Sequence, residues 1–382
     1  MSTAIICELN PFHYGHEYLL RTARLLTGED NIAIMSGSFT QRGEVAVCDK
    51  FTRAKTALRY GADLVVELPT AHAVANAQRF AEGGVRIAQA FSDVRQLAFG
   101  CEDADPDILC TAANALNSER VNALIAAEMR GGGYYPRALE AAVRTIYGDA
   151  VAAAVSSPNN ILAVEYLRAL EGTGIRPLPI QRKGAAHDSQ VVSGRYASAS
   201  HIRSVLRAGG AAKGLLPETP PRVTYPELLD RAVLYCLRTM TAEELRMLPE
   251  VGEGLEQRIL DAAGRARSVE ELLMLVKTKR YTHARLRRIV TCAFLGLTEK
   301  LQTRTVGYVR VLGFTDAGER MLRSCRCEIV TSAAKALRKN DENAAHLHMD
   351  VRSADLAALA YREIMPSNSD FSTKILRKIR QK

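Results

Sequence analysis

The sequence predicts an α/β protein in which a Rossmann-like domain with a parallel sheet precedes a mostly helical C-terminal region. Three observations support this class. In the first half, short apolar runs typical of strands alternate with segments of helical period, which indicates βαβ units and a parallel sheet. A stretch rich in glycine and proline covers residues 209–226. Beyond that stretch, strand patterns become rare.

Each element of the first half has a local signal. Short apolar runs predict strands at residues 4–8, 31–35, 63–68, 94–99 and 176–181. Segments of helical period predict helices at residues 16–26, 49–60, 79–91, 105–147 and 161–170. Because the carboxyl ends of parallel strands meet at the edge of the sheet where such folds bind ligands, we expect the polar loops after the strands to gather there.

The glycine- and proline-rich stretch marks the predicted boundary between two domains, residues 1–215 and residues 216–382. In the second domain, periodicity predicts helices at residues 228–238, 256–266, 269–276, 289–297 and 354–363. Two apolar runs in this domain, residues 306–314 and 327–330, are candidates for a pair of short strands.

Composition narrows the class of protein. The 382 residues carry 51 Lys and Arg against 42 Asp and Glu, a net charge of +9. The eight cysteines are scattered without a Cys-x-x-Cys pair, so we expect reduced thiols and no metal cluster. The apolar runs are too short for a membrane span. Because the N-terminus enters a strand at once, without signal-peptide features, we expect a cytoplasmic protein.

The first strand leads directly into two histidines. After the turn signal Asn10-Pro11, the chain reaches HYGH at residues 13–16, where a predicted helix begins. A helix N-terminus offers unpaired backbone N–H groups and the positive end of the helix dipole, both of which suit phosphate. Gly15 has no Cβ and lets the backbone approach a ligand. The stretch therefore favours a nucleotide phosphate site over a loop with two surface histidines.

A second phosphate-type pattern lies further along the chain. Ser198 and Ser200 open a predicted helix that carries Arg203 on its first turns. Hydroxyl groups, backbone N–H groups and a guanidinium at one helix start are groups that hold phosphate. Without further context, an ordinary capped helix explains the pattern equally well.

The C-terminal region contains a basic segment. Residues 277–288 hold six Lys and Arg side chains and no acidic one, with Tyr281 among them. A basic cluster beside an aromatic ring is typical of a surface that binds RNA or another polyanion. The alternative interpretation is a solvated helix face.

Five segments occur in an order that resembles a known family. They are ELNPFHYGH (8–16), MSGSFTQRGE (35–44), GADLVVELP (61–69), SPNNILA (157–163) and SASHIR (198–203). The first resembles the HIGH-type nucleotidyltransferase superfamily, and together they are similar to the bacterial tRNA(Met) cytidine acetate ligases. The resemblance extends into the basic segment and covers most of the chain. Leu9 stands where an aromatic residue is common, and Ser200 where threonine is common.

This resemblance implies a nucleotidyltransferase fold and a two-step ligase reaction. ATP, accompanied by Mg²⁺, would activate acetate as acetyl-adenylate without acetyl-CoA. The acetyl group would then pass to N4 of the wobble cytidine of elongator tRNA(Met), forming N4-acetylcytidine. The resemblance implies no membrane and no obligate protein partner.

The resemblance also implies roles for individual residues. The catalytic set is His13, His16, Ser198, Ser200 and Arg203. The ATP-binding set adds Cys7, Glu8, Leu9, Asn10, Pro11, Phe12, Gly15, Leu20, Gly100, Asn159, Asn160, Arg182 and Lys183. The acetate and cytidine end is assigned to Gln41, Arg42 and Lys50. The tRNA-binding set is Lys277, Lys279, Arg280, Arg285, Arg287 and Arg288. No residue is assigned to a metal.

Two other functions are compatible with parts of the pattern. A small-molecule adenylyltransferase would share both phosphate-type sites, although it would not explain the basic helical segment. A non-catalytic RNA-binding protein with a vestigial nucleotide site would explain that segment, although the complete set of histidine, serine and arginine side chains argues against it.

Overall fold

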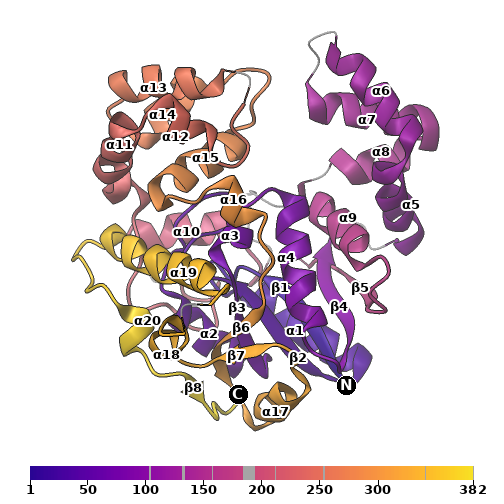
Figure 1. Ribbon diagram of the computed structural model, residues 1–382. Coiled ribbons are helices and arrows are strands. Elements are labelled where there is room, and N and C mark those ends of the chain that lie inside the picture. Colours follow the sequence, from indigo (N-terminus) through magenta and orange to yellow (C-terminus); the bar gives the residue numbers. More distant parts are fainter. Residues whose placement is uncertain are drawn as a thin grey trace.

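A mixed sheet lies at the centre of the computed structural model (Figure 1). The structure describes residues 1–102, 105–130, 134–156, 158–183, 194–210, 212–252, 254–339 and 341–381, except the side chains of residues 158 and 159. The strands are β1 (Ser2–Cys7), β2 (Asp30–Ser36), β3 (Leu64–Leu68), β4 (Val94–Cys101), β5 (Arg176–Gln181), β6 (Tyr308–Phe314), β7 (Glu328–Val330) and β8 (Leu376–Arg377).

The topology of the sheet confirms the predicted Rossmann-like class. The strand order is β5-β4-β1-β2-β3-β6-β7, with β8 paired to β6. The five N-terminal strands are mutually parallel, whereas β6 runs antiparallel to β3. Because the chain proceeds outward from β1 to β3 on one side and from β4 to β5 on the other, the direction of the strand order reverses between β1 and β4. Open α/β sheets bind their ligands at such a reversal, beyond the carboxyl ends of the strands.

Helices surround the sheet and form two lobes beside it. In the N-terminal region they are α1 (Tyr14–Thr27), α2 (Lys50–Arg59), α3 (Thr70–Ala73), α4 (Ala77–Gln89), α5 (Pro106–Asn117), α6 (Glu119–Arg130), α7 (Tyr135–Tyr147), α8 (Asp149–Ser156), α9 (Pro158–Leu170) and α10 (Ala199–Arg207). In the C-terminal region they are α11 (Asp230–Thr239), α12 (Ala242–Arg246), α13 (Leu255–Arg265), α14 (Val269–Val276), α15 (His283–Leu295), α16 (Glu299–Gln302), α17 (Asp316–Met321), α18 (Ala333–Leu337), α19 (Ala344–Ala357) and α20 (Ser369–Ser372).

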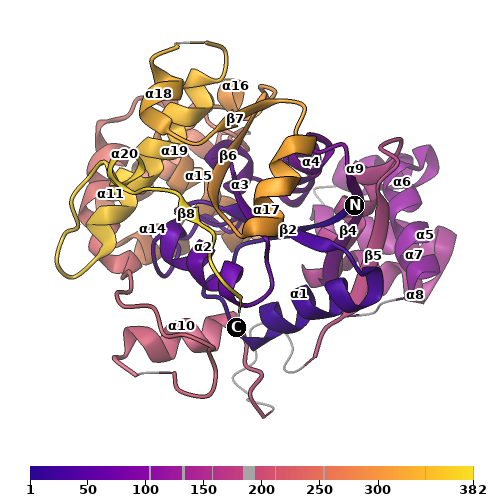
Figure 2. The same ribbon diagram turned by 90° about the horizontal axis from the view of Figure 1, so that it is seen from below.

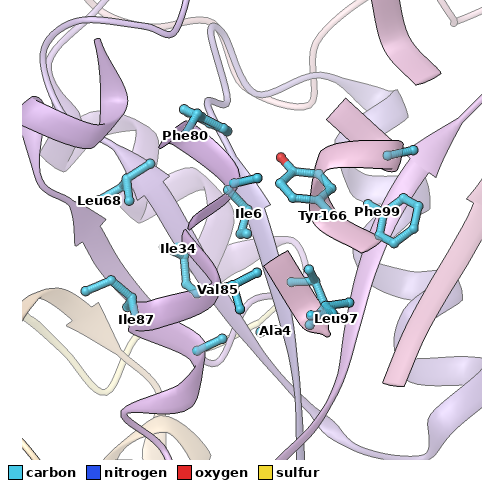
Figure 3. Packing of buried hydrophobic residues seen from close by; sticks show 14 of the residues in the cluster. Ala4, Ile6, Ile34, Leu68, Phe80, Val85, Ile87, Leu97, Phe99 and Tyr166 are labelled. Carbon is cyan, nitrogen blue, oxygen red and sulfur yellow. The ribbon is translucent and has the colours of Figure 1, made fainter. Parts of the chain in front are cut away.

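Alternation along the strands builds a core on each face of the sheet. Ile6 and Ile34 point to the face covered by α4 and α9, where they pack with Phe80 and Tyr166 (Figure 3). Their neighbour Ile5 belongs to a separate cluster under α1 and α2. The view from below shows α1 and α4 on opposite sides of the sheet (Figure 2). Burial on both faces explains why these strands read as nearly continuous apolar runs.

The C-terminal region is mostly helical, and it also adds strands to the sheet. Helices α11 to α15 enclose a second apolar core, to which the loop after β2, α3 and α19 also contribute side chains. These helices form the lobe at the upper left of Figure 1, whereas α5 to α8 form the lobe at the upper right. The strands β6, β7 and β8 come from this region and extend the sheet beyond β3. Among the described residues, no helix is both long and apolar enough to cross a membrane.

One predicted helix is wrong in position. The periodicity indicated residues 354–363, but α19 occupies Ala344–Ala357, and Tyr361 lies in an extended bridge with Thr224. The first half of α19 was not recognised because it buries polar side chains. Asp350 accepts hydrogen bonds from the Thr70 N–H, at 2.7 Å, and from the Tyr308 hydroxyl, at 2.7 Å. A buried carboxylate whose partners are distant in sequence interrupts the apolar periodicity from which a helix is predicted.

Candidate nucleotide and RNA site

The two histidines lie at the start of α1, directly after β1 and beside the reversal of strand order. His13 is the N-cap residue of α1, and its Nδ1 accepts the N–H of Gly15 at 3.0 Å. The Nδ1 of His16 accepts the N–H of His13 at 3.3 Å. The two rings are stacked, with 3.9 Å between their centroids. Because each Nδ1 accepts a hydrogen bond, a neutral ring carries its proton on Nε2 and can donate it to a ligand.

Burial keeps both imidazoles uncharged at neutral pH. It lowers the pKa of His13 to about 3, and the nearby cations Arg182 and Arg203 lower it further. Burial also lowers the pKa of His16 well below its usual value, with smaller contributions from His13 and Arg182. The site therefore offers two neutral hydrogen-bond donors beside two arginines, an arrangement that suits an anionic ligand.

The structure explains why residue 15 is a glycine. A Cβ built on this residue would lie 2.8 Å from Cε1 of His13 and 3.0 Å from its Nδ1. The glycine therefore makes room for the imidazole that caps the helix. Five further residues predicted in this segment are buried: Cys7, Leu9, Pro11, Phe12 and Leu20.

The second phosphate-type pattern is brought to the same loop. The hydroxyl of Ser198 caps α10 by accepting the N–H of His201 at 3.1 Å, and it lies 3.0 Å from the hydroxyl of Ser200. Nη1 of Arg203 donates to the carbonyl of Asn10 at 3.0 Å. Arg203 thus ties α10 to the HYGH loop, defined as residues 8–16 between β1 and the first turn of α1.

The ends of β4 and β5 complete the opposite side. The N–H of Arg182 donates to the carbonyl of Cys101 at 3.0 Å. A Cβ on Gly100 would lie 3.3 Å from Cγ of Arg182, so the glycine allows that side chain to pass across the strand. Lys183 places its Nζ 4.5 Å from the centre of the Tyr18 ring. Gly100 lies at the end of β4, which neighbours β1, and Arg182 and Lys183 follow β5, the strand beyond β4.

Of the two predicted asparagines, the structure describes the side chain of Asn160. Oδ1 of Asn160 accepts the N–H of Glu102 at 3.2 Å, which ties the start of α9 to the chain after β4. The side chain of Asn159 lies outside the described part of the structure.

Three residues were predicted at the acetate and cytidine end, and the structure separates them. The N–H of Gln41 donates to Oε1 of Glu8 at 2.6 Å, and its side chain donates to the carbonyl of Ala75 at 2.9 Å. Arg42 follows at the half-buried tip of the same loop. Lys50 lies deeper, and its buried ammonium group contacts carboxylates 2.8 Å and 2.9 Å away, those of Glu67 and Asp370.

The six predicted tRNA-binding cations fall into two groups. Lys277, Lys279 and Arg280 are exposed, and the last two line an open recess of about 560 Å³ between the start of α13 and the segment that joins α14 to α15. The others make internal contacts. Arg285 donates to the carbonyl of Glu250 at 2.7 Å, Arg288 is buried against the Glu250 carboxylate at 2.6 Å, and Arg287 pairs with Glu44 at 2.6 Å.

Arg53 was missed by sequence reasoning. This buried guanidinium donates to the carbonyls of Glu8, at 2.6 Å, Ser36, at 3.1 Å, and Gly37. It therefore fixes the chain where β1 and β2 end, next to the HYGH loop. The available signal was its place on the apolar face of α2, beside Ala54 and the buried Ala57.

Known proteins resemble this chain over most of its length. The model of the family described as HIGH Nucleotidyl Transferase matches residues 1–371. A tRNA(Met) cytidine acetate ligase of Thermoanaerobacter sp. (strain X514) is 34% identical over 392 residues, covering 96% of this chain and 97% of that protein. The protein of the same name from Caldanaerobacter subterraneus subsp. tengcongensis is 32% identical over 398 residues, covering 98% of each.

Two solved structures resemble the whole chain. The apo form I of Thermotoga maritima TmcAL superimposes with a TM-score of 0.90 at 29% identity, covering 100% of both chains. Form II of the same protein, bound with alpha-thio ATP, superimposes with a TM-score of 0.88 at 28% identity over the same coverage.

Proposed function

The chain belongs to the tRNA(Met) cytidine acetate ligases of the HIGH nucleotidyl transferase family, and we propose that it uses ATP to join acetate to N4 of the wobble cytidine of elongator tRNA(Met). The observation that carries the proposal is the pair of stacked, uncharged imidazoles at the start of α1. Arg203, from the second phosphate-type pattern, is hydrogen-bonded to the same loop. The protein would act in the cytoplasm, where its RNA substrate is found.

Activation of acetate requires no protein nucleophile. A carboxylate oxygen of acetate attacks the α-phosphorus of ATP, the bond from that phosphorus to the leaving pyrophosphate breaks, and acetyl-adenylate forms. The protein must hold two anions together and stabilise the charge that develops on the phosphoryl oxygens. Preorganised neutral donors and arginines meet this need without a change of protonation state.

Each part of the site has a role in this step. His13 and His16 donate from Nε2 to the phosphoryl group under attack. Ser198, Ser200 and Arg203 hold the leaving pyrophosphate at the start of α10. On the opposite side, the adenosine lies against Gly100, where Arg182 and Lys183, with Asn160 or its neighbour Asn159, contact the nucleotide.

Gln41 and Arg42 form the acetate and cytidine end at the tip of the loop after β2. Lys50 supports this end from below. It pairs with Glu67, and a Cβ on Gly37 of the same loop would lie 2.2 Å from Oε1 of Glu67.

Magnesium would accompany ATP as its phosphate counter-ion. Within the described residues there is no group of three His, Cys, Asp or Glu side chains able to hold a metal ion. An ion held mainly by phosphate oxygens and water, the usual mode for Mg²⁺ with nucleotides, needs no such group of protein ligands.

The second step is acyl transfer to the RNA. The N4 amine of cytidine attacks the acetyl carbon, the bond from that carbon to AMP breaks, and the amine loses a proton. Because the lone pair of the amine is delocalised into the ring, it requires an activated acyl group. The base leaves its stack to reach the loop tip, as anticodon-loop bases can. The exposed cations Lys277, Lys279 and Arg280 grip the RNA backbone.

The proposal is tested by incubating the protein with ATP, labelled acetate and total tRNA. We expect label in tRNA(Met), in a reaction that needs ATP and is unaffected by the absence of acetyl-CoA. Label transfer from acetyl-CoA alone, or release of pyrophosphate only with a different acid or nucleotide, would contradict the proposal.

A His16→Ala variant tests whether the activity belongs to this site. It removes one Nε2 donor, and we expect the rate of label transfer to fall by about a hundred-fold or more. The affinity for tRNA(Met) should stay unchanged, because the RNA surface is formed by other elements.

A further inference from the structure

The loop after β2 connects the nucleotide site to the helical lobe. Its tip is a tight turn in which the N–H of Thr40 donates to the carbonyl of Glu44 at 2.9 Å. The flanking residues Phe39 and Val45 belong to the apolar core of the lobe, where Phe39 packs edge-on against Phe294 of α15, with ring centroids 6.5 Å apart. The loop is therefore anchored inside the lobe.

The tip also touches the backbone of α15 directly. Gly43 has a φ of +75°, and a Cβ there would lie 2.9 Å from both the Cα and the N of Arg288. The hydroxyl of Thr291 donates to the carbonyl of Gly43 at 2.6 Å. These contacts fix the position of the tip relative to the helix that carries Arg287.

One side chain of this tip is shared between the two sites. Oε1 of Glu44 accepts from Nη1 of Arg287 at 2.6 Å, and Oε2 lies 3.6 Å from Nη2 of Arg203. Arg203 also donates to the HYGH loop, and Arg287 also pairs with Glu270 at 3.0 Å. The contact to Arg203 is longer than a charge-assisted hydrogen bond of about 2.8 Å, so a phosphate can replace it.

We propose that Glu44 couples the two substrates by serving as a common partner for the arginine of the phosphate site and the arginine of the RNA-facing helix. The inference rests on the proposed function, because it takes Arg203 to bind the phosphates of ATP and α15 to face the tRNA. When only one ligand is bound, its phosphates pair with one of the two arginines, and Glu44 keeps its contact with the other. Both ligands together leave the carboxylate without an arginine, next to two sets of phosphates.

The two substrates are therefore antagonistic until the pyrophosphate departs. Intact triphosphate occupies Arg203, so Glu44 retains Arg287 and RNA phosphates must compete for it. When pyrophosphate leaves after adenylate formation, Arg203 returns to Glu44 and releases Arg287 to the RNA. The acceptor RNA thus binds most tightly when the activated acetyl group is ready.

The coupling is measured with unmodified elongator tRNA(Met) and the non-cleavable analogue α,β-methylene-ATP, in the absence of acetate. We expect the saturating analogue to weaken tRNA binding by about five-fold, within the usual range of coupling between sites. Because coupling is reciprocal, tRNA must weaken analogue binding by the same factor. In Glu44→Gln, both ratios should approach one.

Glu270→Gln is the matched control. It removes a carboxylate from the same Arg287 without touching Arg203, so the coupling ratio should persist. If the two ligands bind but show no coupling in the unaltered protein, or if the ratio is the same in Glu44→Gln, the inference is overturned. Failure of the analogue or of tRNA(Met) to bind at all would instead count against the proposed function.

Discussion

At the scale of single residues, the geometry of the HYGH loop depends on the close approach of the His13 ring to Gly15. The ring of His13 folds back over Gly15 to cap α1, and it leaves Nε2 for the ligand. The cap and the ligand contact are thus two ends of one side chain. A change that moves this ring should affect both the stability of the helix and the binding of phosphate.

Gly15→Ala tests this dependence. The new Cβ would displace the His13 ring, so we expect the free energy of unfolding to fall by about 1 kcal/mol through loss of the cap. We also expect kcat/KM for ATP to fall by at least about ten-fold, because small displacements of positioned groups are costly to catalysis. Denaturant unfolding and steady-state kinetics measure the two effects.

The control for this prediction is Gly264→Ala. Gly264 lies within α13, and a Cβ there would meet no atom within 4 Å. The substitution should leave kcat/KM unchanged and should raise stability by up to about 1 kcal/mol, because alanine favours helix over glycine. Equal losses of activity in the two variants would contradict the role of the His13 ring.

The sequence reveals those residues whose signal is local. HYGH follows a strand and opens a helix within a few positions, so its place could be predicted. The surroundings of Lys50 and Arg288 could not, because their partners Asp370 and Glu250 are distant in sequence. A row of cations in the sequence does not show which members already have internal partners.

At the scale of elements, the basic segment joins α14 to α15 and combines exposed cations with internal ones. Its exposed members lie at the recess that Arg258 and Tyr281 also line. The parallel strands of the first half were predictable from their apolar runs. The buried polar half of α19 was not, because its polar side chains are paired with distant elements.

A double variant, Lys279→Gln with Arg280→Gln, tests the exposed cations. Each cation that neutralises an RNA phosphate releases a counter-ion, so we expect weaker tRNA binding and a salt dependence reduced by about two in the slope of log K against log salt. Filter binding across a salt series gives this slope. Arg267→Gln, an exposed cation of the same lobe, should change it little, and an unaltered slope in the double variant would remove these residues from the RNA surface.

A second element contact, between α3 and α19, should make stability sensitive to acid. The buried rings of His72 and His346 stack with 6.0 Å between centroids. Burial lowers the pKa of His72 to about 4, and it also lowers the pKa of His346. Between about pH 6.5 and pH 4 the unfolded chain binds a proton at His72 that the folded chain does not, so stability falls as the pH falls.

His72→Leu should therefore flatten the pH dependence of unfolding. By pH 4 the loss in the free energy of unfolding that His72 causes, and that the variant lacks, should reach about 3 kcal/mol. Above pH 7 this loss vanishes. Denaturant unfolding at several pH values measures it. His348→Gln, on the exposed face of the same helix, should retain the original slope; an unchanged slope in His72→Leu would show that this ring is not responsible.

At the scale of the whole molecule, a buried ion cluster ties the C-terminal segments to the N-terminal sheet. Lys50 on α2 contacts Glu67 on β3 and Asp370 on α20, and Asp370 also accepts from Arg310 on β6 at 3.2 Å. Because each charge is buried, loss of one member leaves another without a partner. The cluster therefore makes the arrangement of the two regions cooperative.

Lys50→Met should lower the free energy of unfolding by about 3–5 kcal/mol, because it leaves the buried carboxyl group of Glu67 without its cation. Adding Glu67→Gln to Lys50→Met should recover part of this loss, since Asp370 keeps Arg310. Denaturant unfolding compares the two variants. A double variant as unstable as the sum of both single variants would argue against an unpaired charge as the cause.

Above all, we propose that acetate attacks the α-phosphorus of ATP and passes to tRNA(Met) through acetyl-adenylate. The most direct measurement supplies acetate labelled with ¹⁸O in both oxygens, together with ATP and tRNA(Met), and locates the label by mass spectrometry. We predict a single ¹⁸O atom in AMP, the other in the acetyl group on the cytidine, and none in pyrophosphate. Unlabelled AMP, with ¹⁸O in phosphate or pyrophosphate, would contradict the account.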